Sequence, residues 1–158
     1  MTVIAYRAGV LASDSRVTNG TDIMPGGMVK IMRLEDGTLV GACGSAVGIH
    51  ALFEWAQGTR KTKPPRVCKH AYMIMVSPDG SSITQMEGRH PYTLKDTGGY
   101  YADGSGAAFA LGAMHHGATA VEAVSAAIEH NAGCGGEVQV LHLEPVAKPK
   151  RTRRKGSS

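Results

Sequence analysis

The pattern of apolar and polar positions along the chain predicts short strands and a few helices. Apolar runs that end at glycine, proline or aspartate are typical of strands, and apolar positions at helical spacing predict helices. The runs that predict strands are residues 2–6, 10–13, 28–32, 39–43, 71–76, 82–86 and 137–143. The segments that predict helices are residues 47–57, 107–114 and 119–131.

The order of these elements predicts the fold class. Strands come first and are followed by a helix, two strands, two helices and a last strand. This order implies two antiparallel sheets packed face to face with helices outside them, a four-layer αββα sandwich of the α+β class. Residues 20–27 are expected to form a turn-rich connection, and residues 58–65 a basic loop that ends in proline.

The charged residues are distributed unevenly, with a basic segment near the C-terminus and a slightly acidic remainder. The 17 Lys and Arg and 13 Asp and Glu give a formal net charge of +4. Residues 148–155 carry six of the basic side chains, so the rest has 11 basic against 13 acidic residues and a net charge of −2. We expect one folded domain over residues 1–145 and a disordered basic tail over residues 146–158. The tail is either a solubilising terminus or a contact for an acidic partner or nucleic acid.

Composition also bears on the redox state of the cysteines, on cofactor binding and on cellular location. The three cysteines, Cys43, Cys68 and Cys134, are widely spaced and form no Cys-x-x-Cys pair, which indicates reduced thiols. The seven histidines have no metal-ligand spacing, so no metal and no other cofactor is expected. With no apolar run long enough to span a bilayer and no secretory leader, the chain is expected to be cytoplasmic, without membrane contact.

The start of the chain offers a candidate nucleophile. Thr2 follows Met1, and a small second residue permits removal of the initiator methionine. The threonine would then carry a hydroxyl and an α-amine whose reference pKa is about 8. Such an amine can accept the hydroxyl proton and make the oxygen a nucleophile.

Four further patterns give this start a context. Asp14-Ser15-Arg16-Val17-Thr18-Asn19-Gly20 follows the first hairpin, and Lys30 lies sixteen residues after Asp14. Gly104-Ser105-Gly106 precedes a helix, and Asn131-Ala132-Gly133-Cys134-Gly135-Gly136 precedes the last strand. In this order, beside Thr2, the patterns resemble the proteasome β-subunit and HslV group of N-terminal-nucleophile hydrolases over nearly the whole body of the chain.

The resemblance implies a threonine-type peptidase that hydrolyses peptide bonds of peptides or unfolded proteins without a cofactor. Thr2 would be the nucleophile, and its α-amine, assisted by Lys30 and Ser105, would carry the proton. Asp14 would hold Lys30, and the Gly44 N–H would stabilise the oxyanion. Asn131 and Cys134 would support the N-terminus. The family also implies a homo-oligomer and an ATPase regulator.

Each of these residues also has a structural interpretation. Lys30 could be a strand residue that extends its ammonium to the surface, and Asp14 could form an Asx turn. The Ser105 hydroxyl could cap the helix that starts near residue 107. Gly44 could allow a strand and a helix to approach closely. Cys43 is interpreted as a core residue of its strand rather than as a nucleophile.

The chain also departs from the family pattern. Thr2 and Asp14 are twelve residues apart where the family has about sixteen, and direct matching of the first strand places Met1 at the nucleophile position. A hairpin shortened by four residues keeps every side chain on its face, which favours Thr2. Asn131 and Cys134 stand where the family has Asp and Ser. Residues 47–65 have room for one short helix instead of two, which predicts a shortened helical layer and weakens the expected ring contacts.

Two other functions stay open at this stage. The chain could be an N-terminal-nucleophile amidohydrolase that acts on a small amide, because acylases share the fold. It could also be a catalytically inactive proteasome-like subunit with a structural or binding role, which retention of Met1 would support.

Overall fold

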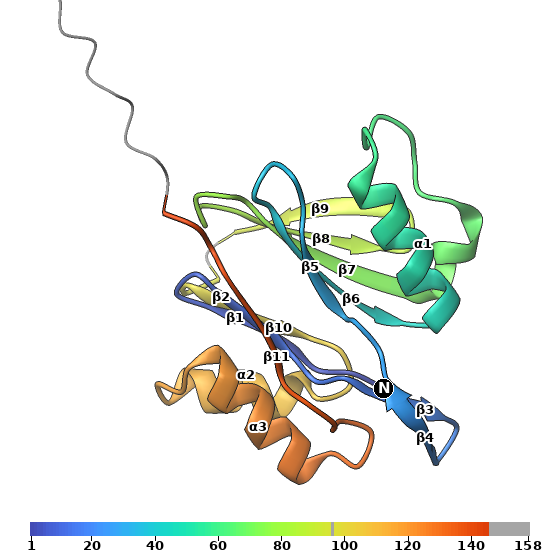
Figure 1. The fold of residues 1–158 in the computed structure, drawn as a ribbon. Coiled ribbons are helices and arrows are strands. Elements are labelled where there is room, and N and C mark those ends of the chain that lie inside the picture. The colour runs from blue at the N-terminus through green and yellow to red at the C-terminus, as the bar shows by residue number, and fades with distance from the viewer. Residues whose placement is uncertain (96, 146–158) are drawn as a thin grey trace, which may run out of the picture.

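The computed structural model describes residues 1–95 and 97–145 of the 158-residue chain. These residues form strands, three α-helices and one 3₁₀ helix, η1 (Figure 1). The strands are β1 (Ile4–Arg7), β2 (Val10–Ser13), β3 (Arg16–Asn19), β4 (Asp22–Gly27), β5 (Ile31–Arg33), β6 (Leu39–Gly44), β7 (Ala71–Val76), β8 (Ile83–Glu87), β9 (His90–Leu94), β10 (Tyr100–Asp103) and β11 (Gln139–His142). The helices are α1 (Ala46–Gln57), η1 (Arg66–His70), α2 (Ala107–His115) and α3 (Ala120–His130).

Two antiparallel sheets form the centre of the fold. One has four strands in the order β10-β1-β2-β11, and the other has five in the order β5-β6-β7-β8-β9. The β1–β2 hairpin turns through Ala8 and Gly9, whose φ angles of 50° and 81° suit a two-residue hairpin turn. Ile4 of β1 lies opposite Ser13 of β2. This register brings the residues just outside the hairpin, Thr2 and Asp14, to the same end of the sheet.

Apolar side chains fill three spaces between these elements. The first core lies between the two sheets and includes Ile4, Leu11, Leu39 and Ile74. The second lies between the four-stranded sheet and helices α2 and α3, and the third between the five-stranded sheet and α1. Figure 1 shows α1 on the outer side of one sheet and α2 and α3 on the outer side of the other. The sheets therefore face one another.

The mixture of helices and antiparallel sheets expected from the sequence is confirmed, and all three helices lie within one residue of their predicted ranges. The prediction of a turn-rich connection over residues 20–27 is wrong, because the strand β4 occupies most of this segment and pairs with β3. The side chains of β4 are exposed along its whole length, so no alternation of apolar and polar residues marks it. The sequence pattern also misses β3, β9 and β10. The strand β9 is mostly exposed, and β10 follows Gly98 and Gly99.

Between α1 and β7 the described chain has only the short helix η1, and residues 58–65 form no helix. The expected basic tail, residues 146–158, lies outside the described residues. No helix in the described part of the chain is long and apolar enough to cross a membrane. The three cysteines are buried and free.

Candidate active site

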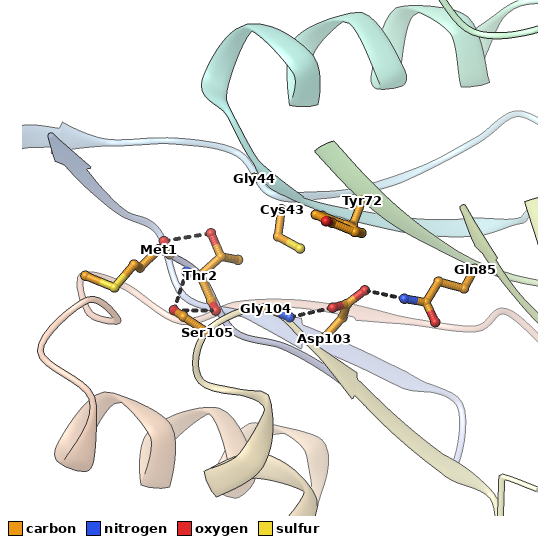
Figure 2. A pocket seen from close by; sticks show the side chains of 9 residues that line it. All are labelled: Met1, Thr2, Cys43, Gly44, Tyr72, Gln85, Asp103, Gly104 and Ser105. Carbon is orange, nitrogen blue, oxygen red and sulfur yellow. Dashed lines mark hydrogen bonds between the residues drawn. The ribbon is translucent and has the colours of Figure 1, made fainter. Parts of the chain in front are cut away.

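Thr2 lies immediately before β1 and is almost completely buried, with 3% of its surface exposed. Its backbone N–H donates a hydrogen bond to Ser105 Oγ at 3.1 Å, as Figure 2 shows. Its carbonyl oxygen accepts from the Gly106 N–H at 3.1 Å. This close approach depends on Gly104, because a Cβ atom there would lie 2.3 Å from the Thr2 carbonyl oxygen. The pairing of β1 with β10 thus places the Gly104-Ser105-Gly106 turn against Thr2.

A buried ion pair lies beside Thr2. Lys30 Nζ is 2.9 Å from Asp14 Oδ1, and both side chains are almost inaccessible to solvent. The two Asp14 oxygens also accept the backbone N–H groups of Val3 and Gly135, each at 3.0 Å. Lys30 Nζ donates to the Arg16 carbonyl at 2.7 Å. The carboxylate therefore binds the start of β1, the loop before β11 and Lys30 at one point, which neither an Asx turn nor a surface lysine would do.

The Met1 carbonyl links this ion pair to the threonine hydroxyl. Thr2 Oγ1 donates to the Met1 carbonyl oxygen at 2.7 Å, and Lys30 Nζ donates to the same oxygen at 3.2 Å. The hydroxyl oxygen and the ammonium nitrogen are therefore within about 6 Å of one another. Removal of Met1 would take away the carbonyl that both groups contact and would leave each with a free hydrogen-bonding position facing the other.

Ser105 faces Thr2 and does not cap α2. The cap residue of that helix is Gly106, and no side chain caps it. Asn131 supports the serine loop, since its Nδ2 donates to the Ser105 carbonyl at 2.8 Å and its Oδ1 accepts from the Gly133 N–H at 2.9 Å. Cys134 is buried behind the same loop, with its Sγ 4.0 Å from Ser105 Oγ. Burial raises the pKa of the Cys134 thiol, so it remains protonated at neutral pH.

Gly44 ends β6 on the opposite side of Thr2. Its φ of 109° lies in the region that favours glycine, and an added Cβ would lie 2.3 Å from the His70 carbonyl oxygen. The next residue, Ser45, caps α1 by accepting a hydrogen bond from the Gly48 N–H at 3.1 Å. The backbone at Gly44 is thus held by the β6–β7 pairing on one side and by a capped helix on the other.

Replacing Gly44 with alanine is expected to lower both stability and any amide hydrolysis. The side chain would overlap the backbone at residue 70 and force a strained φ, at a cost of about 2 to 3 kcal/mol in the free energy of unfolding. Gly112→Ala is the matched control, because Gly112 lies in α2 with no atom near the position of the new Cβ, and alanine favours helix. Urea denaturation of both variants measures the difference. Equal stability of the two variants would contradict the strain assigned to Gly44.

A pocket of 460 Å³ lies between the two sheets with Thr2 at its rim. Its walls come from the chain start, β6, β7, β8 and the β10–α2 turn, and they are formed by Met1, Thr2, Cys43, Gly44, Tyr72, Gln85, Asp103, Gly104 and Ser105. A smaller pocket of 50 Å³ also reaches Thr2 and Gly44, and its lining includes Arg16 and Lys30. Thr2 therefore lies between a large pocket and a small one.

The structure brings the predicted site residues together. Thr2, Asp14, Lys30 and Ser105 form one connected set of contacts, Gly44 lines the same pockets, and Asn131 and Cys134 lie behind Ser105. Burial raises the pKa of the Cys43 thiol to about 12, which fits its interpretation as a core residue rather than a nucleophile.

Sequence reasoning missed three residues of the large pocket, namely Tyr72, Gln85 and Asp103. They lie on β7, β8 and β10, and only the packing of the two sheets brings them near Thr2. For Gln85 and Asp103, the sequence contained a feature that could have marked them as site residues. Gln85 is a polar residue at a buried position of a strand, and Asp103 directly precedes the glycine-serine turn.

Comparison with known proteins places the fold. No family model matches the chain, and no curated protein does. Among solved structures, Thiobacillus denitrificans BPH in complex with epoxomicin is similar with a TM-score of 0.63 and 22% identity over 91% of this chain and 99% of that chain. Another structure of BPH gives a TM-score of 0.64 and 21% identity over 92% and 99%. Eukaryotic HslV from Trypanosoma brucei gives a TM-score of 0.62 and 19% identity over 89% and 98%. The expected resemblance to the HslV group is confirmed for the fold.

Proposed function

We propose that this chain is a threonine-type peptidase of the HslV kind, with Thr2 as nucleophile after removal of Met1. The observation that carries the proposal is the position of Thr2. Its backbone nitrogen contacts Ser105 Oγ, and its hydroxyl shares the Met1 carbonyl with a lysine that is itself paired to a buried aspartate. Acyl transfer by threonine needs a nucleophile, which would be the Thr2 hydroxyl, and a proton carrier, which would be the Thr2 amine. It also benefits from a nearby positive charge, here Lys30, that favours their deprotonated forms.

The proposed reaction begins with the loss of Met1, which converts the Thr2 amide nitrogen into an amine. The amine accepts the hydroxyl proton as Thr2 Oγ1 attacks the carbonyl carbon of the substrate amide. The oxyanion that forms is stabilised by the backbone N–H of Gly44. The amine then donates the proton to the leaving nitrogen, the C–N bond breaks, and water hydrolyses the ester on Thr2. The positive charge of Lys30 favours the deprotonated forms of the hydroxyl and the amine, and Ser105 orients the amine.

The fold and its relatives suggest the wider setting. We infer that the elements form the four-layer αββα sandwich of this group, that the chain assembles as a homo-oligomer and that peptides or unfolded proteins are its substrates. A cytoplasmic location and an ATPase regulator belong to the same proposal. Because BPH is described in complex with epoxomicin, we expect this chain to bind epoxomicin too, and inhibition by that compound is a test of the proposed class.

The intact mass of the purified chain tests the first step. We expect a mass lower than that of the full sequence by one methionine residue, because the small side chain of Thr2 permits removal of Met1. Thr2→Lys, whose large second residue blocks removal of methionine, is the control and should keep the full mass. Retention of Met1 in the unaltered protein, together with absence of peptide hydrolysis, would favour an inactive subunit instead. Hydrolysis of small amides but not of peptides would favour an acylase-like amidohydrolase.

A further inference from the structure

We propose that the large pocket beside Thr2 selects a basic side chain, lysine or arginine, in the residue next to the scissile bond, and that Asp103 is the residue that selects it. This inference rests on the proposed peptidase function and adds a substrate class to it. It is carried by a carboxylate in the pocket wall that has hydrogen-bond donors but, among the described residues, no cationic partner.

The Asp103 carboxylate is held in a fixed orientation. Its Oδ1 accepts from the Gly104 N–H at 2.7 Å, and its Oδ2 accepts from Gln85 Nε2 at 3.1 Å. The amide of Gln85 is oriented in turn, because the Tyr101 hydroxyl donates to its Oε1. Figure 2 shows Asp103 and Gln85 turned towards one another across the pocket. An ionised carboxylate offers about four acceptor positions, so two remain for a ligand.

In the described part of the chain, Asp103 has no counter-charge, whereas the buried carboxylate of Asp14 has one. Asp14 is paired with Lys30. Within residues 1–95 and 97–145, no lysine, arginine or histidine forms an ion pair with Asp103, and none lines the large pocket. A partly buried charge without a partner is unfavourable, and a cationic group in the pocket would offset that cost.

The rest of the pocket suits a long basic side chain. Tyr72 lines the wall, and an aromatic ring beside a carboxylate can stack against a guanidinium or contact an ammonium. The second pocket that reaches Thr2 has the cationic side chains of Arg16 and Lys30 in its lining, and these would repel a basic group. An amide bond placed at the Thr2 hydroxyl would therefore direct a basic neighbouring side chain towards Asp103.

The titration of this region gives the proposal a pH dependence. Burial raises the pKa of the Asp103 carboxyl, and the nearby carboxylate of Glu87 raises it further. The other titratable groups near Asp103 include Cys43 on β6, Tyr92 on β9 and Tyr101 on β10, which are neutral in the acidic range. Tyr72 lines the same pocket, and so does Thr2, whose α-amine becomes titratable once Met1 is removed. The preference for basic residues should therefore be present above the raised pKa of Asp103 and decline as the pH falls through it.

A panel of fluorogenic peptides tests the inference in the full-length protein. The peptides differ only in the residue before the scissile bond, which is Arg, Lys, Gln, Leu or Glu, and a second panel varies the residue after it. We expect one panel to show kcat/KM about 10- to 100-fold higher for Arg and Lys than for Gln, the range of one charge-assisted contact. Asp103→Asn should remove this preference and its pH dependence. Glu129→Gln, which removes one exposed charge on α3, is the control and should leave both unchanged.

A binding measurement separates this inference from the proposed function. The Thr2→Ala variant, which cannot turn over, is titrated by calorimetry with the Arg peptide and the Gln peptide. We expect the Arg peptide to bind at least tenfold more tightly, and the Thr2→Ala/Asp103→Asn double variant to bind the two equally. Hydrolysis or binding without a preference for basic residues would overturn the inference and leave the peptidase proposal standing. Selective binding without hydrolysis by the unaltered protein would instead overturn the peptidase proposal.

Discussion

Thr2→Ala should abolish peptide hydrolysis, with a loss of kcat on the order of 10³-fold or more, and leave the protein folded. The variant keeps a small second residue, so Met1 is still removed and the free amine remains. Only the hydroxyl and one methyl group are lost, and the one hydrogen bond that the hydroxyl makes to the described residues is the one it donates to the Met1 carbonyl. Steady-state hydrolysis of a fluorogenic peptide, with a thermal melt to verify folding, measures the effect.

Two other variants complete this experiment. Thr2→Ser retains an attacking hydroxyl and should keep part of the activity. Thr93→Ala removes a threonine hydroxyl from the exposed strand β9, far along the chain from the site, and should be as active as the unaltered protein. Undiminished turnover in Thr2→Ala would assign the nucleophile to another group and remove the proposed mechanism.

The sequence predicts the positions of the candidate site residues where they lie close to the strand ends of a recognisable hairpin. Asp14 follows β2 directly, and the pairing of β1 with β2 is strong because both strands are buried. That register continues to Val3, which lies opposite Asp14, so Thr2 lies one residue beyond it at the same end of the sheet. The contact between Thr2 and Ser105 is less local, but it rests on the same sheet, since β10 pairs with β1.

The parts that the sequence does not predict depend on packing between separate sheets. Asp103 and Gln85 meet because β10 belongs to the four-stranded sheet and β8 to the five-stranded sheet, and no spacing along the chain encodes that contact. The strand β4 fails for another reason. It is exposed on both faces, so burial imposes no alternating pattern on its sequence.

Burial also explains why Lys30 could be interpreted in two ways from the sequence. A lysine in an apolar run usually extends to the surface, whereas here it is one of the largest fully buried side chains. Its three donor positions are all used, by Asp14, the Arg16 carbonyl and the Met1 carbonyl. A buried cation next to the proposed nucleophile is a costly arrangement even when it is fully hydrogen-bonded, which supports a catalytic rather than a structural reason for its presence.

Lys30→Met should therefore have the largest effect on stability. Methionine fills a similar volume but leaves the Asp14 carboxylate buried without a cation, at a cost of about 3 to 5 kcal/mol in the free energy of unfolding. Arg60→Met is the matched control. It breaks the ion pair of Arg60 with Asp36, whose side chains are 33% and 45% exposed, and should cost no more than about 1 kcal/mol. Urea denaturation measures both, and equal losses would show that the Lys30 charge is not needed to balance Asp14.

A double variant separates the stabilising role of Lys30 from its catalytic one. In Lys30→Met/Asp14→Asn the buried charge is absent, so part of the lost stability should return. The recovery should be incomplete, because the single amide oxygen of asparagine cannot accept from both Val3 and Gly135 as the two carboxylate oxygens do. Peptide hydrolysis should stay absent in the double variant, since the ammonium that faces the Thr2 hydroxyl is still missing. Recovery of hydrolysis along with stability would mean that Lys30 serves the fold alone, and the proton transfer at Thr2 would then need only its own amine and Ser105.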